Sequence, residues 1–372
     1  MEAQKKIALF TCHEDPNYGS MLQAFALAAA ITSLGYKAEY ITYRDYPLRS
    51  WPIRFAKRII KSLGLNTAQH EFSFFETPAF ASTRNAFIKF HNAYIPASQK
   101  VFYSNTIKEL NILNEYDNFI VGSDQTWSPH LYNERIPYFL DFTNLSKRNA
   151  YAPSMGTTTI PDKYKQLLKL KLSTFNHISC REQTNCKMLS SLLGREVRHV
   201  LDPTLLLTSK EWDKVSVAPK IEGEYILAYI LGEKDFIASF AEQLGKTQNM
   251  PVYYIVTRPK HLNHPYILTG VGPDDFVGLV KHAKYVVTDS FHGCLFCINY
   301  NRQFYAFSKR NGANNFQDNI RILEFLQLLH LEKRFMDDNN TNLQEDVDYE
   351  KVNRRLDIMR RDSFEYLSQC LD

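Results

Sequence analysis

Short apolar runs of the kind found in buried strands alternate with stretches of helical spacing along most of the chain. The first unit consists of the run KKIALFTC at 5–12, a polar loop, a helical pattern from Ser20 to Leu34 and a second run at 37–43. The alternation continues with strands predicted at 118–122, 148–152, 177–180 and 197–201 and helices predicted at 163–172 and 182–193. Because parallel strands need crossover helices between them, this pattern predicts a parallel sheet covered on both faces.

A second set of the same units follows the polar segment 208–224, which has little periodicity. Strands are predicted at 225–231, 252–256, 285–288 and 303–307, and helices at 235–245, 273–283 and 293–300. The stretch 347–369 predicts a final helix with arginines between its apolar positions. The sequence therefore predicts an α/β protein with two doubly wound, Rossmann-like domains whose strand carboxyl ends face a shared cleft.

The length of 372 residues agrees with about two domains, since single cores rarely grow so large. We divide the chain into an N-terminal α/β domain, a linker, a C-terminal α/β domain and a closing helix, at residues 1–210, 211–222, 223–335 and 336–372.

Charge and cysteine usage narrow the class of protein. A net charge of +4 over 372 residues is too small and too dispersed to indicate nucleic-acid binding. The six cysteines lack the dense spacing of a disulfide scaffold and are interpreted as reduced thiols. The apolar run that begins at Ile7 stops at His13, too early for an export segment, and no run approaches the roughly 20 apolar residues that span a bilayer. We therefore expect a cytoplasmic protein.

The segment 51–63 predicts a short basic amphipathic helix, placed at 54–63. A helix packed on its own domain with a solvated basic face is the favoured interpretation, and peripheral contact with the inner face of an anionic membrane is the alternative. The basic residues at helical spacing are Arg54, Lys57, Arg58 and Lys61.

The loop between the first strand and its helix contains Asn17, Gly19 and Ser20, and Gln23 lies one turn into the helix. Backbone amides at such a helix N-terminus can hold an anion or a sugar hydroxyl. The simpler interpretation is a turn in which Ser20 caps the helix.

Polar groups follow the strand at 118–122 abruptly, in the sequence VGSDQTW. Asp124 is a candidate general acid or base or a sugar-binding carboxylate, Gln125 follows it, and Trp127 could stack on a pyranose ring. An Asx cap next to a core tryptophan is an equally good interpretation.

The strand YVVT runs into Asp289-Ser290-Phe291-His292-Gly293 and then into an apolar helical stretch. An imidazole at a helix N-terminus can exchange protons near neutral pH, so His292 is the leading general acid or base among eleven histidines. Cys294 and Cys297 form a C-x-x-C without a second pair, which favours buried thiols over a metal site.

Several cationic residues could bind an anionic substrate, because arginine forms paired hydrogen bonds with carboxylate or phosphate and lysine supplies a compact charge. The candidates near strand ends or in a helix are Arg148, Arg181, Lys309, Arg310 and Arg321.

Seven short motifs occur in a fixed order: NYGSMLQAFAL (17–27), VGSDQTW (121–127), AYAPSMG (150–156), CRE (180–182), LDPT (201–204), TDSFHG (288–293) and NIRI (319–322). Together they resemble the polysaccharide pyruvyl transferase family over residues 7 to about 335. The resemblance implies a fold similar to that of two-domain B-type glycosyltransferases, phosphoenolpyruvate as co-substrate, and a hexose diol, commonly the 4- and 6-hydroxyls, as acceptor. It also implies a bacterial role in capsule or exopolysaccharide assembly, where the acceptor is often lipid-linked.

The resemblance implies that the N-terminal domain binds the acceptor, that the C-terminal domain binds the donor, and that neither a metal nor another cofactor is needed. His292 and Asp124 would move protons. The donor would contact Arg181, Ser290, Lys309, Arg310 and Arg321. The acceptor would contact Asn17, Gly19, Gln23, Gln125, Trp127 and Tyr151.

One departure from the family pattern bears on the function. Some members carry a basic residue shortly before the histidine of the last strand motif, where this chain has Ser290-Phe291. Arg181, Lys309 and Arg310 are therefore all candidates for the group that binds the donor carboxylate. The departure favours the alternative of a catalytically silent carbohydrate-binding relative, and a nucleotide-sugar glycosyltransferase on the same architecture is a separate alternative.

Overall fold

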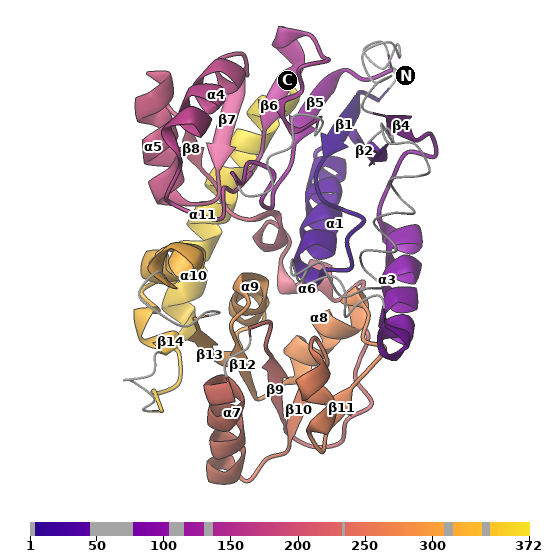
Figure 1. Cartoon of the computed structure of the whole chain (residues 1–372), viewed down its shortest axis with the longest axis vertical. Helices are drawn as coiled ribbons and strands as arrows, with labels where there is room; N and C mark the ends of the chain where they lie inside the picture. The colour runs from indigo at the N-terminus through magenta and orange to yellow at the C-terminus, as the bar shows by residue number, and fades with distance from the viewer. Residues whose placement is uncertain are drawn as a thin grey trace, which may run out of the picture.

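The structure is a computed structural model that describes residues 4–44, 77–103, 115–129, 137–232, 235–308, 315–336 and 343–372. Within these ranges the chain forms two six-stranded sheets in tandem, joined by helices that pack between them (Figure 1). The basic segment predicted at 51–63 lies outside the described residues, as do Lys309 and Arg310.

The first sheet is parallel throughout and has the order β2-β1-β5-β6-β7-β8. Its register places Leu9 opposite both Tyr40 and Ile120. The strands are β1 (Lys6–Phe10), β2 (Lys37–Tyr40), β5 (Asn118–Val121), β6 (Arg148–Ala150), β7 (His177–Cys180) and β8 (Arg198–His199). A separate two-stranded ribbon pairs β3 (Tyr43–Arg44) with β4 (Phe102–Tyr103).

The second sheet is also parallel and has the order β11-β10-β9-β12-β13-β14. Its strands are β9 (Ile226–Tyr229), β10 (Val252–Ile255), β11 (Ile267–Leu268), β12 (Tyr285–Thr288), β13 (Gln303–Phe307) and β14 (Phe335–Met336). The two doubly wound sheets confirm the fold class predicted from the alternation.

Helices cover both faces of each sheet, as Figure 1 shows. The N-terminal helices are α1 (Tyr18–Ser33), α3 (Ala81–Tyr94), α4 (Asp162–Leu172) and α5 (Gln183–Leu193). The remaining helices are α6 (Ser209–Trp212), α7 (Asp235–Gln248), α8 (Pro273–His282), α9 (Phe291–Asn299), α10 (Asn315–Leu329) and α11 (Tyr349–Leu371). None of the helices among the described residues is long and apolar enough to cross a membrane.

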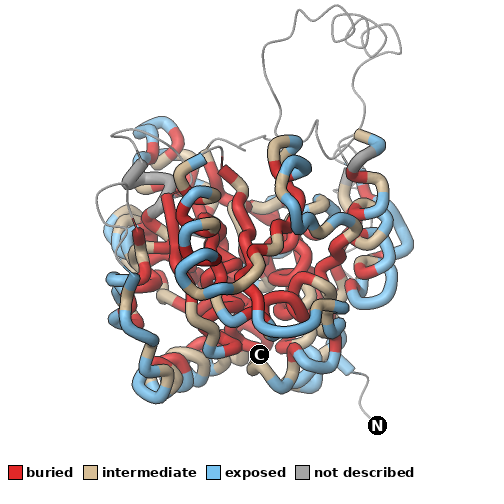
Figure 2. The backbone as a smooth tube through the Cα atoms, turned by 90° about the horizontal axis from the view of Figure 1, so that it is seen from below, coloured by how far each residue is buried: buried red, intermediate tan, exposed pale blue. Residues whose placement is uncertain are grey.

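The strands are apolar at successive positions because each face has its own partner. In β1, Ile7 and Leu9 belong to the core that contains α1, whereas Ala8 and Phe10 belong to the core that contains α4 and α5. Figure 2 shows the buried residues gathered in the interior of the molecule and the exposed residues around its outside.

One continuous core joins the two domains. The cluster on the α1 side of the first sheet also contains residues of β9, α8 and α9 from the second domain. Tyr18 stacks on Phe276 with 4.9 Å between ring centroids, and its hydroxyl donates to the carbonyl of Val271 at 2.9 Å. Trp212, in the segment predicted as a linker, is buried between Phe25 and Phe296. The domains therefore meet through an apolar interface as well as through the cleft.

The C-terminal helix α11 returns to the first sheet, which Figure 1 shows as the yellow helix running beside both domains. The Tyr366 hydroxyl donates to the carbonyl of Ala150 at 2.9 Å, and the Asn118 side chain donates to the carbonyl of Cys370 at 2.8 Å. The predicted closing helix is thus part of the N-terminal domain's packing.

Candidate active site

Both sheets have a topological switch point, where ligands bind in doubly wound folds. In the first sheet β2 lies on one side of β1, and β5 lies on the other side of β1 with the later strands beyond it. The loops that follow β1 and β5 therefore flank the switch point. In the second sheet β9 and β12 have the same relation. Asp124 follows β5 and His292 follows β12, so the two leading candidates lie at the two switch points.

His292 is held at the start of α9 by the Ser290 cap, whose hydroxyl oxygen accepts from the Gly293 amide at 3.2 Å. Its imidazole reaches the N-terminal domain, where Nε2 lies 3.5 Å from Asp202 Oδ2. The ring also fills the space beside Gly19, since a Cβ built there would lie 2.0 Å from His292 Nδ1. Only glycine at position 19 allows this close approach.

Asp202 is a central residue of the site, although the sequence motif LDPT that contains it indicated no role for it. Its carboxylate accepts from the Thr204 amide at 3.0 Å and from Arg181 Nη1 at 2.6 Å. Burial raises the pKa of Asp202, but His292, Arg181 and the Thr204 amide outweigh that effect and hold the pKa well below its usual range. Asp202 is therefore an ionised carboxylate that orients both His292 and Arg181.

The Arg181 guanidinium is buried beneath the site among three carboxylates. It lies 2.6 Å from Asp202, 3.5 Å from Glu182 and 4.0 Å from Asp124, and its carbon lies 4.6 Å from the centre of the Phe291 ring. Its Nη2 has no hydrogen-bond partner among the described residues. Three acidic neighbours balance the buried charge, and one terminal nitrogen remains for a further acceptor.

Asp124 adopts the left-handed conformation, with φ of 74°, which aspartate tolerates better than most residues. The Ser20 hydroxyl donates to its Oδ2 at 2.5 Å. Burial raises the pKa of Asp124, but Arg181, His292, Ser20 and Arg321 together keep it below its usual range. The group is therefore a carboxylate at neutral pH, suited to accept a proton and not to donate one.

Arg321 reaches the same place from α10, and its guanidinium carbon lies 5.8 Å from the centre of the Phe291 ring. With the Gln125 amide turned so that its oxygen faces Arg321, that oxygen lies 3.2 Å from both terminal nitrogens. Gln125 in turn packs against Gly156, where φ is 70°. The structure thus brings together Asp124, Gln125, Arg181, Ser290, His292 and Arg321, with Gly19 beside them.

Three other residues that the sequence suggested as acceptor contacts are buried in the core. The Trp127 side chain is 0% exposed and its indole nitrogen donates to the carbonyl of Tyr138. Tyr151 donates to the carbonyl of Leu201, and Gln23 donates to Thr11 Oγ1. The predicted sugar contacts of these three residues are corrected accordingly, because no solvent-accessible face remains for a pyranose ring. Asn17 caps α1, so the cap is Asn17 and not Ser20.

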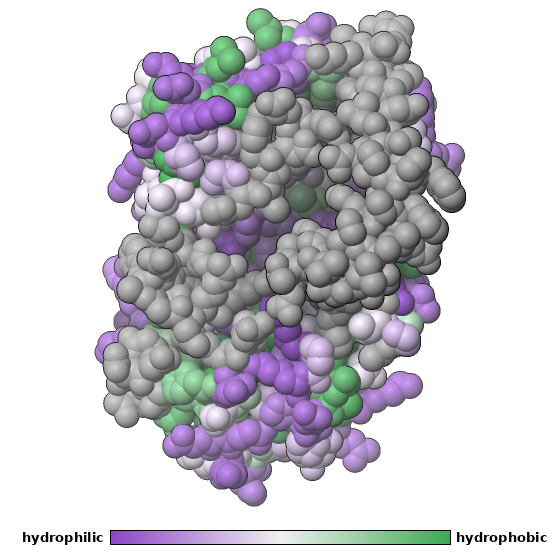
Figure 3. Space-filling model, viewed as in Figure 1, coloured by the Kyte–Doolittle hydropathy of each residue, from purple (hydrophilic) through white to green (hydrophobic). Residues whose placement is uncertain are grey.

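The C-x-x-C cysteines are buried in α9, as expected for structural thiols. Figure 3 shows hydrophilic residues in a hollow between the upper and lower halves of the molecule. Buried ionised groups of both signs, a histidine shared by two domains and a polar hollow form an arrangement suited to proton transfer on an anionic substrate.

Comparisons with known proteins agree with this architecture. The family model described as polysaccharide pyruvyl transferase matches residues 17–311. An α-glucosyltransferase solved with UDP and a 13-mer DNA superposes with a TM-score of 0.51 at 10% identity, over 98% of this chain and 100% of that one. This likeness shows a shared two-domain, B-type glycosyltransferase fold. No curated protein is detectably similar in sequence.

Two epimerase structures give lower scores. A UDP-GlcNAc 2-epimerase from Methanocaldococcus jannaschii has a TM-score of 0.47 at 10% identity, over 96% of this chain and 92% of that one. The UDP-GlcNAc 2-epimerase from Neisseria meningitidis, solved with UDP-GlcNAc, has a TM-score of 0.46 at 10% identity, over 98% and 100% of the two chains.

Proposed function

Because the chain belongs to the polysaccharide pyruvyl transferase family, we propose that it transfers pyruvate from phosphoenolpyruvate to two hydroxyls of a sugar. The proposed acceptor is a hexose 4,6-diol of a surface-polysaccharide or lipid-linked precursor, and the product is a cyclic ketal. The position of His292 carries the proposal: it comes from the second domain and lies against Asp202 of the first, and Asp202 shares the Arg181 guanidinium with Asp124.

The chemistry needs one acid and one base at the same carbon centre. Protonation of the methylene carbon of phosphoenolpyruvate leaves positive charge on the adjacent carbon. One sugar hydroxyl attacks that carbon and loses its proton, phosphate leaves as its C–O bond breaks, and the second hydroxyl closes the ring with loss of its proton. One released proton balances the proton taken up by the methylene carbon, and the other leaves with phosphate.

The residues of the site match these roles. His292 would deliver the proton to the methylene carbon while Asp202 holds its Nε2 side. Asp124, an ionised carboxylate, would accept the hydroxyl proton. Arg181 Nη2 and Arg321 would bind the donor's carboxylate and phosphate, which matches the preference of guanidinium groups for such anions. Lys309 and Arg310 stay as further donor-binding candidates.

The first test is calorimetric titration of the purified protein with phosphoenolpyruvate, with UDP-sugars as the comparison ligands. We expect phosphoenolpyruvate to bind with a dissociation constant between about 1 μM and about 1 mM, the range usual for substrates, and UDP-sugars not to bind. Binding of a UDP-sugar alone would instead assign the chain to nucleotide-sugar transfer. Phosphate release should then require a sugar diol as well as phosphoenolpyruvate, and sugar binding without any phosphate release would indicate a catalytically silent relative.

Gly19→Ala should lower turnover by about 100-fold, because the added Cβ would displace the His292 ring by an ångström or more. Alanine has a higher helix propensity than glycine, so the substitution should not destabilise the helix that contains it. Phosphate release at saturating phosphoenolpyruvate measures the effect. Ser33→Ala, at the exposed end of the same helix, is the control. Wild-type turnover in Gly19→Ala would show that the position of His292 does not matter.

A further inference from the structure

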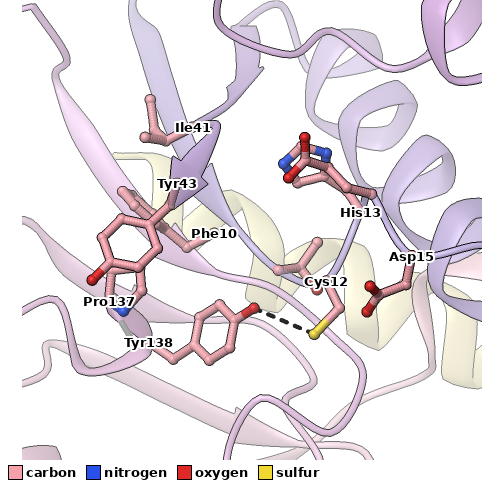
Figure 4. Close-up of a pocket in the computed structure, with 10 residues that line it drawn as sticks. Phe10, Cys12, His13, Asp15, Ile41, Tyr43, Pro137 and Tyr138 are labelled. Carbon is pink, nitrogen blue, oxygen red and sulfur yellow. Dashed lines mark hydrogen bonds between the residues drawn. The ribbon is translucent and has the colours of Figure 1, made fainter. Parts of the chain in front are cut away.

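A cavity of about 240 Å³ opens at the carboxyl end of β1. Figure 4 shows it as the space between two tyrosine rings on one side and the loop after β1 on the other. Its described lining comprises Phe10, Thr11, Cys12, His13, Glu14, Asp15, Ile41, Tyr43, Pro137 and Tyr138. None of the motif residues that suggested an acceptor contact lines it.

The walls of this cavity differ in chemistry. Phe10, Ile41, Tyr43, Pro137 and Tyr138 form an apolar and largely aromatic wall. Glu14 and Asp15 add two carboxylates to the lining. Figure 4 shows Asp15 on the side away from the tyrosine rings, whereas the Cys12 thiol lies 3.3 Å from the Tyr138 hydroxyl and joins the two sides. A pyranose ring has the complementary character, since its C–H face packs on aromatic rings and its hydroxyls donate to carboxylates.

The cavity adjoins the proton-transfer groups. The hydroxyl of Thr11, which lines it, donates to the carbonyl of Ser123 at 2.6 Å, immediately before Asp124. Burial, followed by the charge of Asp124, raises the pKa of the Cys12 thiol to about 12. Burial also raises the pKa of Tyr138, with Asp124 among the contributing charges. The hydrogen bond from Thr11 therefore ties the lining of the cavity to the residue that directly precedes Asp124.

Charge and size restrict the ligand class. The described lining contains two carboxylates and neither lysine nor arginine, so a multiply charged donor such as phosphoenolpyruvate is disfavoured there. The volume of about 240 Å³ is below the roughly 300–1,000 Å³ of pockets that hold drug-sized ligands, which favours a single sugar ring over a nucleotide sugar.

On the basis of the proposed function, we infer that this cavity binds the acceptor pyranose. One face of the ring packs on Tyr43 and Tyr138, the hydroxyls on the far side donate to Glu14 and Asp15, and the reacting diol faces Asp124. The donor then occupies the opposite side of Asp124, next to Arg181 and Arg321.

The test uses saturation-transfer NMR with the methyl pyranosides of glucose, galactose and mannose, in the absence of phosphoenolpyruvate. Wild type should transfer saturation to at least one of them. Tyr138→Ala and Asp15→Asn should weaken that binding by about tenfold or more, the loss expected for one contact with a charged group or an aromatic ring. Cys12→Phe should abolish binding by filling the cavity. Tyr103→Ala, an exposed tyrosine outside the cavity, should bind as wild type does.

Calorimetric binding of phosphoenolpyruvate to the same variants separates the inference from the proposed function. We expect the donor affinity of all four variants to stay within about twofold of wild type, which also shows that they are folded. Pyranoside binding that is absent in wild type, or unchanged in Tyr138→Ala, Asp15→Asn and Cys12→Phe, would overturn the acceptor site. Pyranoside binding that depends on the cavity, in a protein that does not bind phosphoenolpyruvate, would overturn the proposed function and leave the sugar site standing.

Discussion

Replacing His292 with alanine should lower the turnover number for phosphate release by about 10²–10⁴-fold, the usual contribution of a positioned general acid or base. The variant removes a titratable group of the second domain that lies against Asp202. We expect the affinity for phosphoenolpyruvate to change much less than turnover, because the proposed anion contacts come from Arg181 and Arg321. Steady-state phosphate release and calorimetry measure the two quantities separately.

Two further observations separate proton transfer from a merely structural role of His292. Added imidazole should restore part of the turnover of His292→Ala, since the small base can occupy the space that the side chain leaves. His264→Ala is the matched control, because His264 belongs to the same domain but contacts Tyr254 and Glu242 and not the residues of the site. Turnover of His292→Ala within about threefold of wild type would remove His292 from the mechanism.

The fold could be predicted from the sequence largely because the strands are covered on both faces. Tyr285–Thr288 and Ile226–Tyr229 are apolar at nearly every position, a signal that survives without an alignment. The helix α3 was not predicted, since only Thr83, Phe87 and Phe90 are buried in it and its remaining positions are mostly polar. The two-residue strands β11 and β14 are too short to give a periodic pattern.

The site residues could be predicted where a polar side chain directly follows a buried strand, and not elsewhere. His292 and Asp124 were found because a polar group directly follows a buried strand. Asp202 was missed because its importance depends on Arg181 and His292, which are remote in sequence and meet it only in the folded chain. For Trp127 the sequence left a sugar contact and a core position open, because the direction of a side chain in an irregular loop cannot be deduced from periodicity, and the structure buries it.

The interface between the domains also depends on residues that are remote in sequence. Gly19, Asp202 and His292 belong to three separate motifs, and their contacts fix how the second domain sits on the first at the cleft. The apolar contacts of Tyr18 with Phe276 lie immediately beside them. A precise domain arrangement is therefore part of the catalytic geometry, since an error of one ångström at the reacting atoms is costly.

Asp202→Asn should lower the free energy of unfolding at neutral pH by about 3–5 kcal/mol, because it leaves the buried Arg181 guanidinium without its closest carboxylate. Asp141→Asn is the matched control. Asp141 also pairs with a cation at 2.6 Å, but the pair is exposed, so its loss should cost no more than about 1 kcal/mol. Urea unfolding followed by the fluorescence of the buried tryptophans measures both variants.

The free energy of unfolding should also depend on pH in a way that distinguishes wild type from Asp202→Asn. The folded-state pKa of Asp202 lies well below the value of about 3.9 expected in the unfolded chain, so its stabilisation is complete above that pH and is lost as pH falls toward the folded pKa. Below about pH 4 wild type should therefore lose up to about 1.4 kcal/mol per pH unit from this one group, and Asp202→Asn should not. The stability difference between wild type and Asp202→Asn must then narrow with acidification. A difference that is small at pH 7, or that stays constant below pH 4, would show that Asp202 is not an ionised, buried partner of Arg181.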